Sequence, residues 1–125
     1  MSLTLNWIEC FHLRLTLRET RLFKTPIEGG YISQFISQTE LPLTDDQRKQ
    51  IHYREQLNAD GELMGFTYDT NEVEKITKTV EVSKEAAAFV SDLIKQMLSQ
   101  NLISGHEWAS WAGPAYKKLQ TYILT

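Results

Sequence analysis

The sequence predicts an α+β protein, a single domain over residues 1–125 in which helices cover one face of an antiparallel sheet. Apolar and polar residues alternate over residues 3–17 and again around 50–82, as they do in strands that bury one face. The apolar spacing then changes to three and four residues over 84–102, which is typical of an amphipathic helix. With 125 residues, 42% of them hydrophobic and 23% charged, the chain is long enough to bury its own core.

The N-terminal segment 3–17 is predicted to form one long strand. Seven of its eight odd positions are apolar, whereas its even positions are mostly polar. A helix would instead align Trp7, Phe11 and Leu15, but it would leave three of the segment's leucines on other faces. We therefore favour the strand.

The next segment, residues 18–43, carries mixed signals. Pro26 and the pair Gly29–Gly30 favour a turn, because proline and glycine interrupt regular structure. Residues 31–38 fit either a strand or a short helix, and the sequence leaves both open.

A hairpin is predicted after a short helical turn. Thr44 and Gln47 have the spacing of a capping box, in which each side chain bonds the other residue's backbone N–H at a helix start. Two alternating segments follow, over about 50–57 and 62–69, and the turn formers between them include Gly61.

A third strand and the main helix complete the predicted sheet and its cover. Residues 76–82 alternate again, so that the three strands would form a meander over about 50–82. Ser83 is the expected N-cap of the helix over 84–102. The apolar stripe of that helix is predicted to cover the buried face of the sheet.

The C-terminal region is predicted to form short helices rich in aromatic residues. Ser104 and Glu107 form another capping-box pattern, Gly113 would end that helix, and Pro114 would start the last one. The two lysines that follow lie opposite the aromatic residues, whereas a base-stacking site needs cations beside its rings. The aromatic side chains are therefore predicted to pack on the core or on a partner subunit. The candidate interface residues are Trp108, Trp111, Tyr116, Leu119, Tyr122 and Ile123.

No motif of a catalytic or cofactor chemistry is recognisable in the sequence. The glycines match no phosphate-binding loop. The three histidines lie far apart, and none has a second ligand at the spacing that a zinc site needs. The acidic pairs fall in predicted turns rather than on a rigid scaffold. We expect a protein that is not an enzyme and that holds no metal or cofactor.

Cysteine content and charge limit the compartment and the partners. Cys10 is the only cysteine, so no internal disulfide can form and a reducing, cytoplasmic location is expected. Charges interrupt every apolar stretch, so we expect neither a signal peptide nor a membrane span. Residues 27–85 carry twelve acidic and six basic side chains, which argues against a protein that coats nucleic acid.

The leading functional prediction is a small interaction protein that forms a homodimer through residues 106–124 and binds a protein partner. The alternative is a module for nucleic acid or an anionic ligand. On a strand, His12, Arg14 and Arg18 would share the polar face as a row of donors about 7 Å apart, suited to phosphate or an acidic surface. The interpretation we favour for this row is an exposed face that pairs with acidic side chains of a neighbouring strand.

Overall fold

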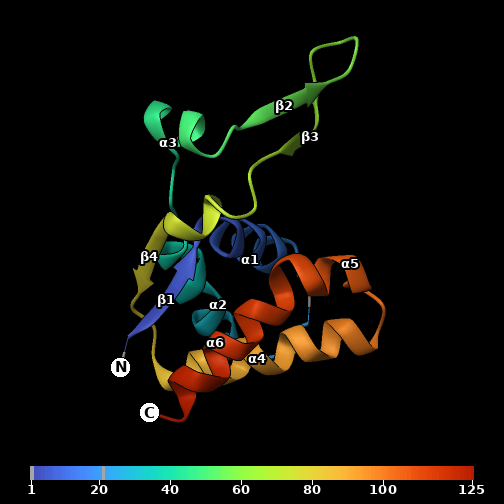
Figure 1. The fold of residues 1–125 in the computed structure, drawn as a ribbon. Coiled ribbons are helices and arrows are strands. Elements are labelled where there is room, and N and C mark those ends of the chain that lie inside the picture. The colour runs from blue at the N-terminus through green and yellow to red at the C-terminus, as the bar shows by residue number, and fades with distance from the viewer. Residues whose placement is uncertain (1, 21) are drawn as a thin grey trace.

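Helices make up most of the molecule, and a short hairpin projects from them (Figure 1). The computed structural model describes residues 2–20 and 22–125. In chain order, the elements are β1 (Leu3–Asn6), α1 (Trp7–Glu19), α2 (Pro26–Gln38), α3 (Asp45–Gln50), β2 (Arg54–Leu57), β3 (Leu63–Thr67), the 3-10 turn η1 (Val73–Lys75), β4 (Thr77–Val80), α4 (Lys84–Ser99), α5 (Gly105–Glu107), the π-helical turn η2 (Trp108–Ala112) and α6 (Gly113–Ile123).

The α+β class is confirmed, but the strands pair differently from the predicted meander. The strands of the described chain form two separate antiparallel sheets of two strands each, β1 with β4 and β2 with β3. The predicted third strand exists as β4, but its partner is β1, with Leu3 opposite Val80. The chain turns away from the hairpin at Asp69, whose carboxylate accepts the N–H groups of Asn71 and Glu72 before the η1 turn.

The prediction of one long N-terminal strand is wrong beyond Asn6, where β1 ends and α1 begins. A capping box starts α1 there: the Asn6 side-chain oxygen accepts from the Glu9 N–H at 2.9 Å, and Glu9 Oε1 accepts from the Asn6 N–H at 2.8 Å. These bonds satisfy two of the donors that a helix start leaves unpaired. The alternation did not match burial throughout, because Ile8 and Cys10 of the predicted polar face are buried, whereas Leu15 of the predicted apolar face is 44% exposed.

The predicted turn at Pro26 and Gly29–Gly30 is also wrong, because these residues lie inside α2. Thr25 and Glu28 cap the helix start through a second reciprocal box, and Pro26 occupies a first-turn position, where its missing N–H costs nothing. Residues 31–38 are helical. Of the two alternatives that the sequence left open, the helix is correct.

The predicted hairpin is confirmed, although its first strand begins at Arg54 rather than at residue 50, and the predicted helix starts at Thr44 and Ser83 are confirmed. Thr44 and Gln47 form the expected capping box at the start of α3. β2 and β3 pair antiparallel, and Gly61 takes a positive φ of 80° in the loop between them. Ser83 caps α4, which ends at Ser99, slightly earlier than expected.

The main core lies among the helices rather than between a helix layer and a broad sheet. α4 packs between α2 and α6, and α6 also contacts β1. The apolar stripe of α4 is buried as its periodicity predicts, through Val90, Leu93, Ile94 and Met97. Each such side chain contributes about 1.5–3 kcal/mol through burial. Among the described residues, no helix is both long and apolar enough to cross a membrane.

The C-terminal helices form one continuous helical run instead of two helices separated at Gly113. The backbone of Gly113 is right-handed helical, with φ −63° and ψ −51°, so the glycine does not end a helix. The η2 turn widens the helix just before it, and the Trp108 carbonyl and indole lie where a Gly113 side chain would be. The capping box at Ser104 and Glu107 is confirmed.

α3 and the β2–β3 hairpin form an arm beside the helical body (Figure 1). A second, smaller apolar cluster joins the arm to the body. Its buried members are Trp7, Ile8, Ile51, Val73 and Ile76. Half-buried aromatic rings of the hairpin pack against this cluster, whereas the apolar side chains at the hairpin tip are exposed and do not belong to it.

Candidate functional site

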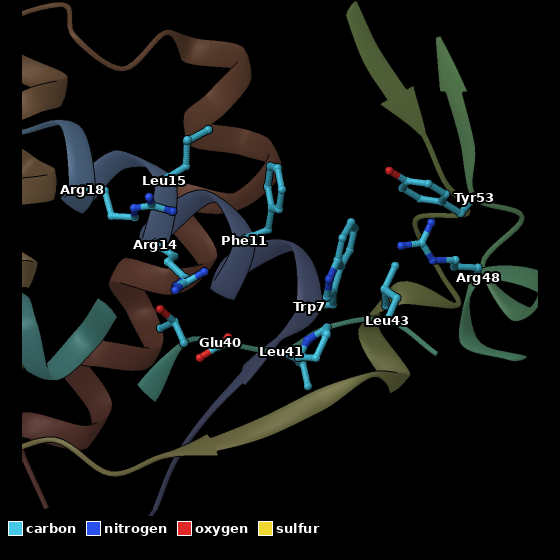
Figure 2. Close-up of a pocket in the computed structure, with 12 residues that line it drawn as sticks. Trp7, Phe11, Arg14, Leu15, Arg18, Glu40, Leu41, Leu43, Arg48 and Tyr53 are labelled. Carbon is cyan, nitrogen blue, oxygen red and sulfur yellow. The ribbon is translucent and has the colours of Figure 1, made fainter. Parts of the chain in front are cut away.

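A groove of about 340 Å³ lies where the arm meets the body. α1 forms one wall, the extended segment 39–43 the second, and the residues around the start of the hairpin the third (Figure 2). We call it the arginine groove; its lining is Trp7, Phe11, Arg14, Leu15, Arg18, Thr39, Glu40, Leu41, Pro42, Leu43, Arg48 and Tyr53.

The α1 wall exists because residues 7–18 are helical. Trp7, Phe11, Arg14 and Arg18 follow one another at steps of three and four residues, so they share one face of the helix. Figure 2 shows the two arginines at one end of the groove and the two aromatic rings nearer its middle. On the predicted strand, Trp7 and Phe11 would have pointed away from the arginines. The helix brings all four together.

The arginines on α1 are held to different degrees. The Arg14 Nε–H donates to the Ile36 carbonyl of α2 at 3.2 Å, which anchors this half-buried side chain. The Arg18 side chain is exposed, and within residues 2–20 and 22–125 no hydrogen bond or ion pair engages its guanidinium. Arg18 therefore keeps all its donors for a ligand.

The opposite end of the groove carries a third arginine. Arg48 of α3 lies over the ring of Tyr53, with its guanidinium carbon 5.0 Å from the ring centroid. Its Nη1 is 3.9 Å from Glu55 Oε1, a long contact between two exposed side chains that contributes little. Burial, together with the 3.2 Å hydrogen bond that the phenol donates to Glu55, raises the pKa of Tyr53 and keeps it neutral.

The floor between the two ends is aromatic and tightly packed. The Trp7 ring lies 5.5 Å from that of Phe11 and 6.2 Å from that of Tyr53, the second contact edge-on at 85°. Phe66 of the hairpin packs against all three rings. Trp7 is only 7% exposed, so its faces are covered by the protein itself. The floor offers apolar edges rather than open ring faces.

The groove is positively charged. Its three arginines face one carboxylate, that of Glu40, within the lining. Leu41, Pro42 and Leu43 follow Glu40 and give the same wall an apolar surface. An anionic group at each end and an apolar group between them would match this arrangement.

Only two of the three predicted anion-binding residues come together. Arg14 and Arg18 line the groove, but His12 lies on another face of α1 and stacks on Trp111, with centroids 5.4 Å apart and planes at 13°. Burial lowers the pKa of His12, and the Glu107 carboxylate only partly opposes this. The predicted row of three donors is corrected to a pair, because a helix places residue 12 between about a third and a half of a turn away from residues 14 and 18.

The predicted interface residues at the C-terminus lie partly inside the chain's own core. Trp111 and Leu119 are buried, at 1% and 0% exposure, so neither offers surface to a partner in this conformation. The other four candidates, Trp108, Tyr116, Tyr122 and Ile123, are half-buried against the same core. The Tyr122 hydroxyl donates to the Val82 carbonyl at 2.6 Å.

A partly buried ion pair joins α1 to α6. Lys118 Nζ lies 2.6 Å from Glu9 Oε1, and the Glu9 side chain is only 1% exposed. Glu9 Oε2 is buried without a hydrogen-bond partner in the described structure. This carboxylate caps α1 and ties the C-terminal helix to it.

Cys10 and the histidines form no reactive or metal-binding cluster in the described chain. Burial, with a smaller effect of the neighbouring Glu9 carboxylate, raises the pKa of the Cys10 thiol to about 11. A thiol of this pKa is a poor nucleophile at neutral pH. Across residues 2–20 and 22–125, no three His, Cys, Asp or Glu side chains are grouped so as to hold a metal ion.

Several residues of the groove were not identified from the sequence. Arg48, Glu40 and Tyr53 come from segments distant from α1, and no local pattern links them to it. A local signal did exist for α1 itself, since Asn6 and Glu9 have the capping-box spacing immediately before the Trp7, Phe11 and Leu15 stripe. Comparison with family models, with curated proteins and with solved structures finds no match for this chain.

Proposed function

We propose that the protein is a non-enzymatic interaction protein whose arginine groove binds an acidic, partly apolar segment of a partner protein. The observation that supports this most directly is the placement of Arg14, Arg18 and Arg48 at the two ends of one aromatic floor. Guanidinium groups pair with carboxylates through two parallel hydrogen bonds, which favours carboxylates at both ends. Leu41 and Leu43 favour aliphatic side chains between them.

A protein segment fits the groove better than nucleic acid does. Single-stranded nucleic acid binds where aromatic ring faces are free for base stacking. Here Trp7 is almost fully covered, and Arg48 already lies over the ring of Tyr53. The net charge of −3 and the carboxylate of Glu40 in the lining also oppose a polyanion. Nucleic acid remains the second candidate because the three arginines are also suited to phosphate.

The compartment proposed is the cytoplasm. The single cysteine, Cys10, is a buried free thiol, which suits a reducing environment.

Defined probes test the proposed function. Fluorescence anisotropy would be measured with a short labelled peptide of alternating Glu and Leu, with the matching Lys and Leu peptide, and with a labelled oligothymidylate. We expect the Glu–Leu peptide to bind most tightly, and the double substitution Arg18→Glu/Arg48→Glu to weaken it by about tenfold or more. Both residues are exposed, so we expect the substitutions to leave the fold intact. Arg14 is kept because it bonds the Ile36 carbonyl.

The matched control is Lys24→Glu/Lys95→Glu, which makes the same change in net charge at two exposed lysines outside the groove. It should leave binding of the Glu–Leu peptide nearly unchanged. Equal weakening by both double variants would show a nonspecific charge effect and contradict the proposal. Tighter binding of the oligothymidylate than of the Glu–Leu peptide would support the nucleic-acid candidate instead.

A further inference from the structure

The hairpin tip carries three exposed apolar side chains close together. Leu57, Leu63 and Met64 are 57%, 55% and 70% exposed. Leu57 lies opposite Leu63 in the β2–β3 register, and within the part of the chain that the structure describes no third strand joins this sheet. A two-stranded sheet is at best marginally stable in water by itself, and it presents unpaired backbone groups along both edges. The tip therefore has both the apolar surface and the free edges that a partner would cover.

The same tip is acidic. Residues 57–64 contain Asp60 and Glu62 and no lysine or arginine. The arginine groove has the opposite charge, with three arginines against one carboxylate, and it too is partly apolar. One chain thus carries an acidic, apolar projection and a basic, apolar groove.

The tip cannot reach the groove of its own chain. Tyr53 lines the groove and immediately precedes β2, and Figure 1 shows the hairpin extending from there away from the helical body. Each extended residue adds about 3.3 Å, so the loop at Gly61 lies well beyond the groove. A groove that covers this tip would therefore belong to another molecule.

We propose that the β2–β3 hairpin of a second copy occupies the arginine groove, so that two chains form a twofold dimer by exchanging arms. This rests on the proposed function, because it names one acidic, apolar segment that the groove takes. When two hairpins lie antiparallel, the tip of each reaches the base of the other, where Arg48 and Tyr53 lie. In the twofold arrangement both arms and both grooves are occupied within the pair, so no arm or groove is left to extend the assembly into a filament.

Equilibrium sedimentation of the full chain tests the dimer. The arm variant Asp60→Lys/Glu62→Lys and the groove variant Arg18→Glu/Arg48→Glu should each weaken self-association by about tenfold or more, because each places like charges together. A chain with all four substitutions should associate again, because both surfaces are then reversed. The control Glu81→Lys/Asp92→Lys changes two exposed carboxylates away from the tip and the groove and should leave the dimer unchanged.

The Glu–Leu peptide separates this inference from the proposed function. It should dissociate the dimer, because peptide and arm compete for one groove. A chain that sediments as a monomer near 100 micromolar (a concentration of about this order exceeds the Kd of most stable dimers) but binds the peptide would overturn the dimer alone. A chain that neither associates nor binds the peptide would overturn both proposals. A dimer weakened by Tyr116→Ala but by neither charge variant would place the interface on α6 and overturn arm exchange.

Discussion

At the scale of single residues, Glu9 shows how one side chain can serve two elements. Its Oε1 accepts the Asn6 N–H at the start of α1 and also lies 2.6 Å from Lys118 Nζ of α6. A carboxylate this deeply buried is costly unless it is paired. The lysine, 41% exposed along its side chain, supplies the charge and still reaches water.

Replacing Lys118 by Met should therefore destabilise the fold by about 3 kcal/mol, because it leaves the Glu9 charge buried and unpaired. Urea denaturation monitored by tryptophan fluorescence would measure the change. Lys117→Met removes an exposed charge one residue earlier and should cost less than about 0.5 kcal/mol. Adding Glu9→Gln to Lys118→Met should recover part of the loss, since an amide keeps the capping acceptor without the charge. No recovery would show that packing, and not charge, is responsible.

At the scale of elements, capping boxes define where helices begin. The boxes at Asn6, Thr25, Thr44 and Ser104 start α1, α2, α3 and α5. Two of them, at Thr44 and Ser104, are predictable from the sequence and were correct. At Asn6 and Thr25 the same spacing is present in the sequence, but the predictions there rested on the alternation over 3–17 and on the glycine pair. In both places the local hydrogen bonds were the better guide.

The geometry of the π-helical turn η2 explains why residue 113, which follows it, is a glycine. A Cβ on Gly113 would lie 2.8 Å from the Trp108 carbonyl oxygen and 3.0 Å from its indole nitrogen. The first neighbour is backbone and cannot move independently. A side chain at position 113 must therefore displace the turn, and with it the core packing of Trp111.

Two glycine-to-alanine substitutions should act in opposite directions. Gly113→Ala should destabilise by about 1–3 kcal/mol through overpacking. Gly30→Ala, at an exposed position inside α2 with no atom within 4 Å, should stabilise by about 0.5–1 kcal/mol, because alanine loses less backbone entropy. Thermal unfolding followed by circular dichroism would compare them. Equal shifts in Tm for the two variants would contradict the steric explanation.

At the scale of the whole molecule, the helical body and the arm differ in how much of them is buried. α4 carries several residues with almost no exposure, among them Val90 and Leu93. All four residues of β2 are exposed, and the arm is tied to the body mainly through Trp7, Ile51 and their neighbours. Regions with few buried apolar contacts open at lower free energy than the core.

Hydrogen exchange should reveal this difference. In dilute protein, the paired amides of 54–57 and 63–67 should exchange at least about a hundredfold faster than those in the middle of α4. At high protein concentration, exchange in the arm should slow, whereas exchange in α4 should not, because a second copy then covers the arm. Mass spectrometry of peptides from both regions at two concentrations would measure this. If the arm amides exchange as slowly as those of α4 at the lower concentration, the arm is not less stable than the body and the prediction is wrong.

The sequence alone determined the features that depend on neighbouring residues. These are the α+β class, the hairpin around Gly61, the α4 stripe and its Ser83 cap, and the helix starts at Thr44 and Ser104. Each depends on a local period or on hydrogen bonds across about one turn of chain. These short-range interactions form without contacts between distant segments of the chain.

Only the tertiary structure decided which strands pair and which side chains share a surface. β4 pairs with β1 rather than with β3. Arg48 lies at one end of the aromatic floor, and Arg14 and Arg18 lie at the other. Both outcomes depend on packing between segments that lie far apart in the chain, and many alternative pairings satisfy the same local patterns. The physical reason is that the hydrophobic effect is non-directional, so its free energy depends on how much apolar area is buried and not on which segments bury it. The choice among these arrangements is made by the fit of the whole core.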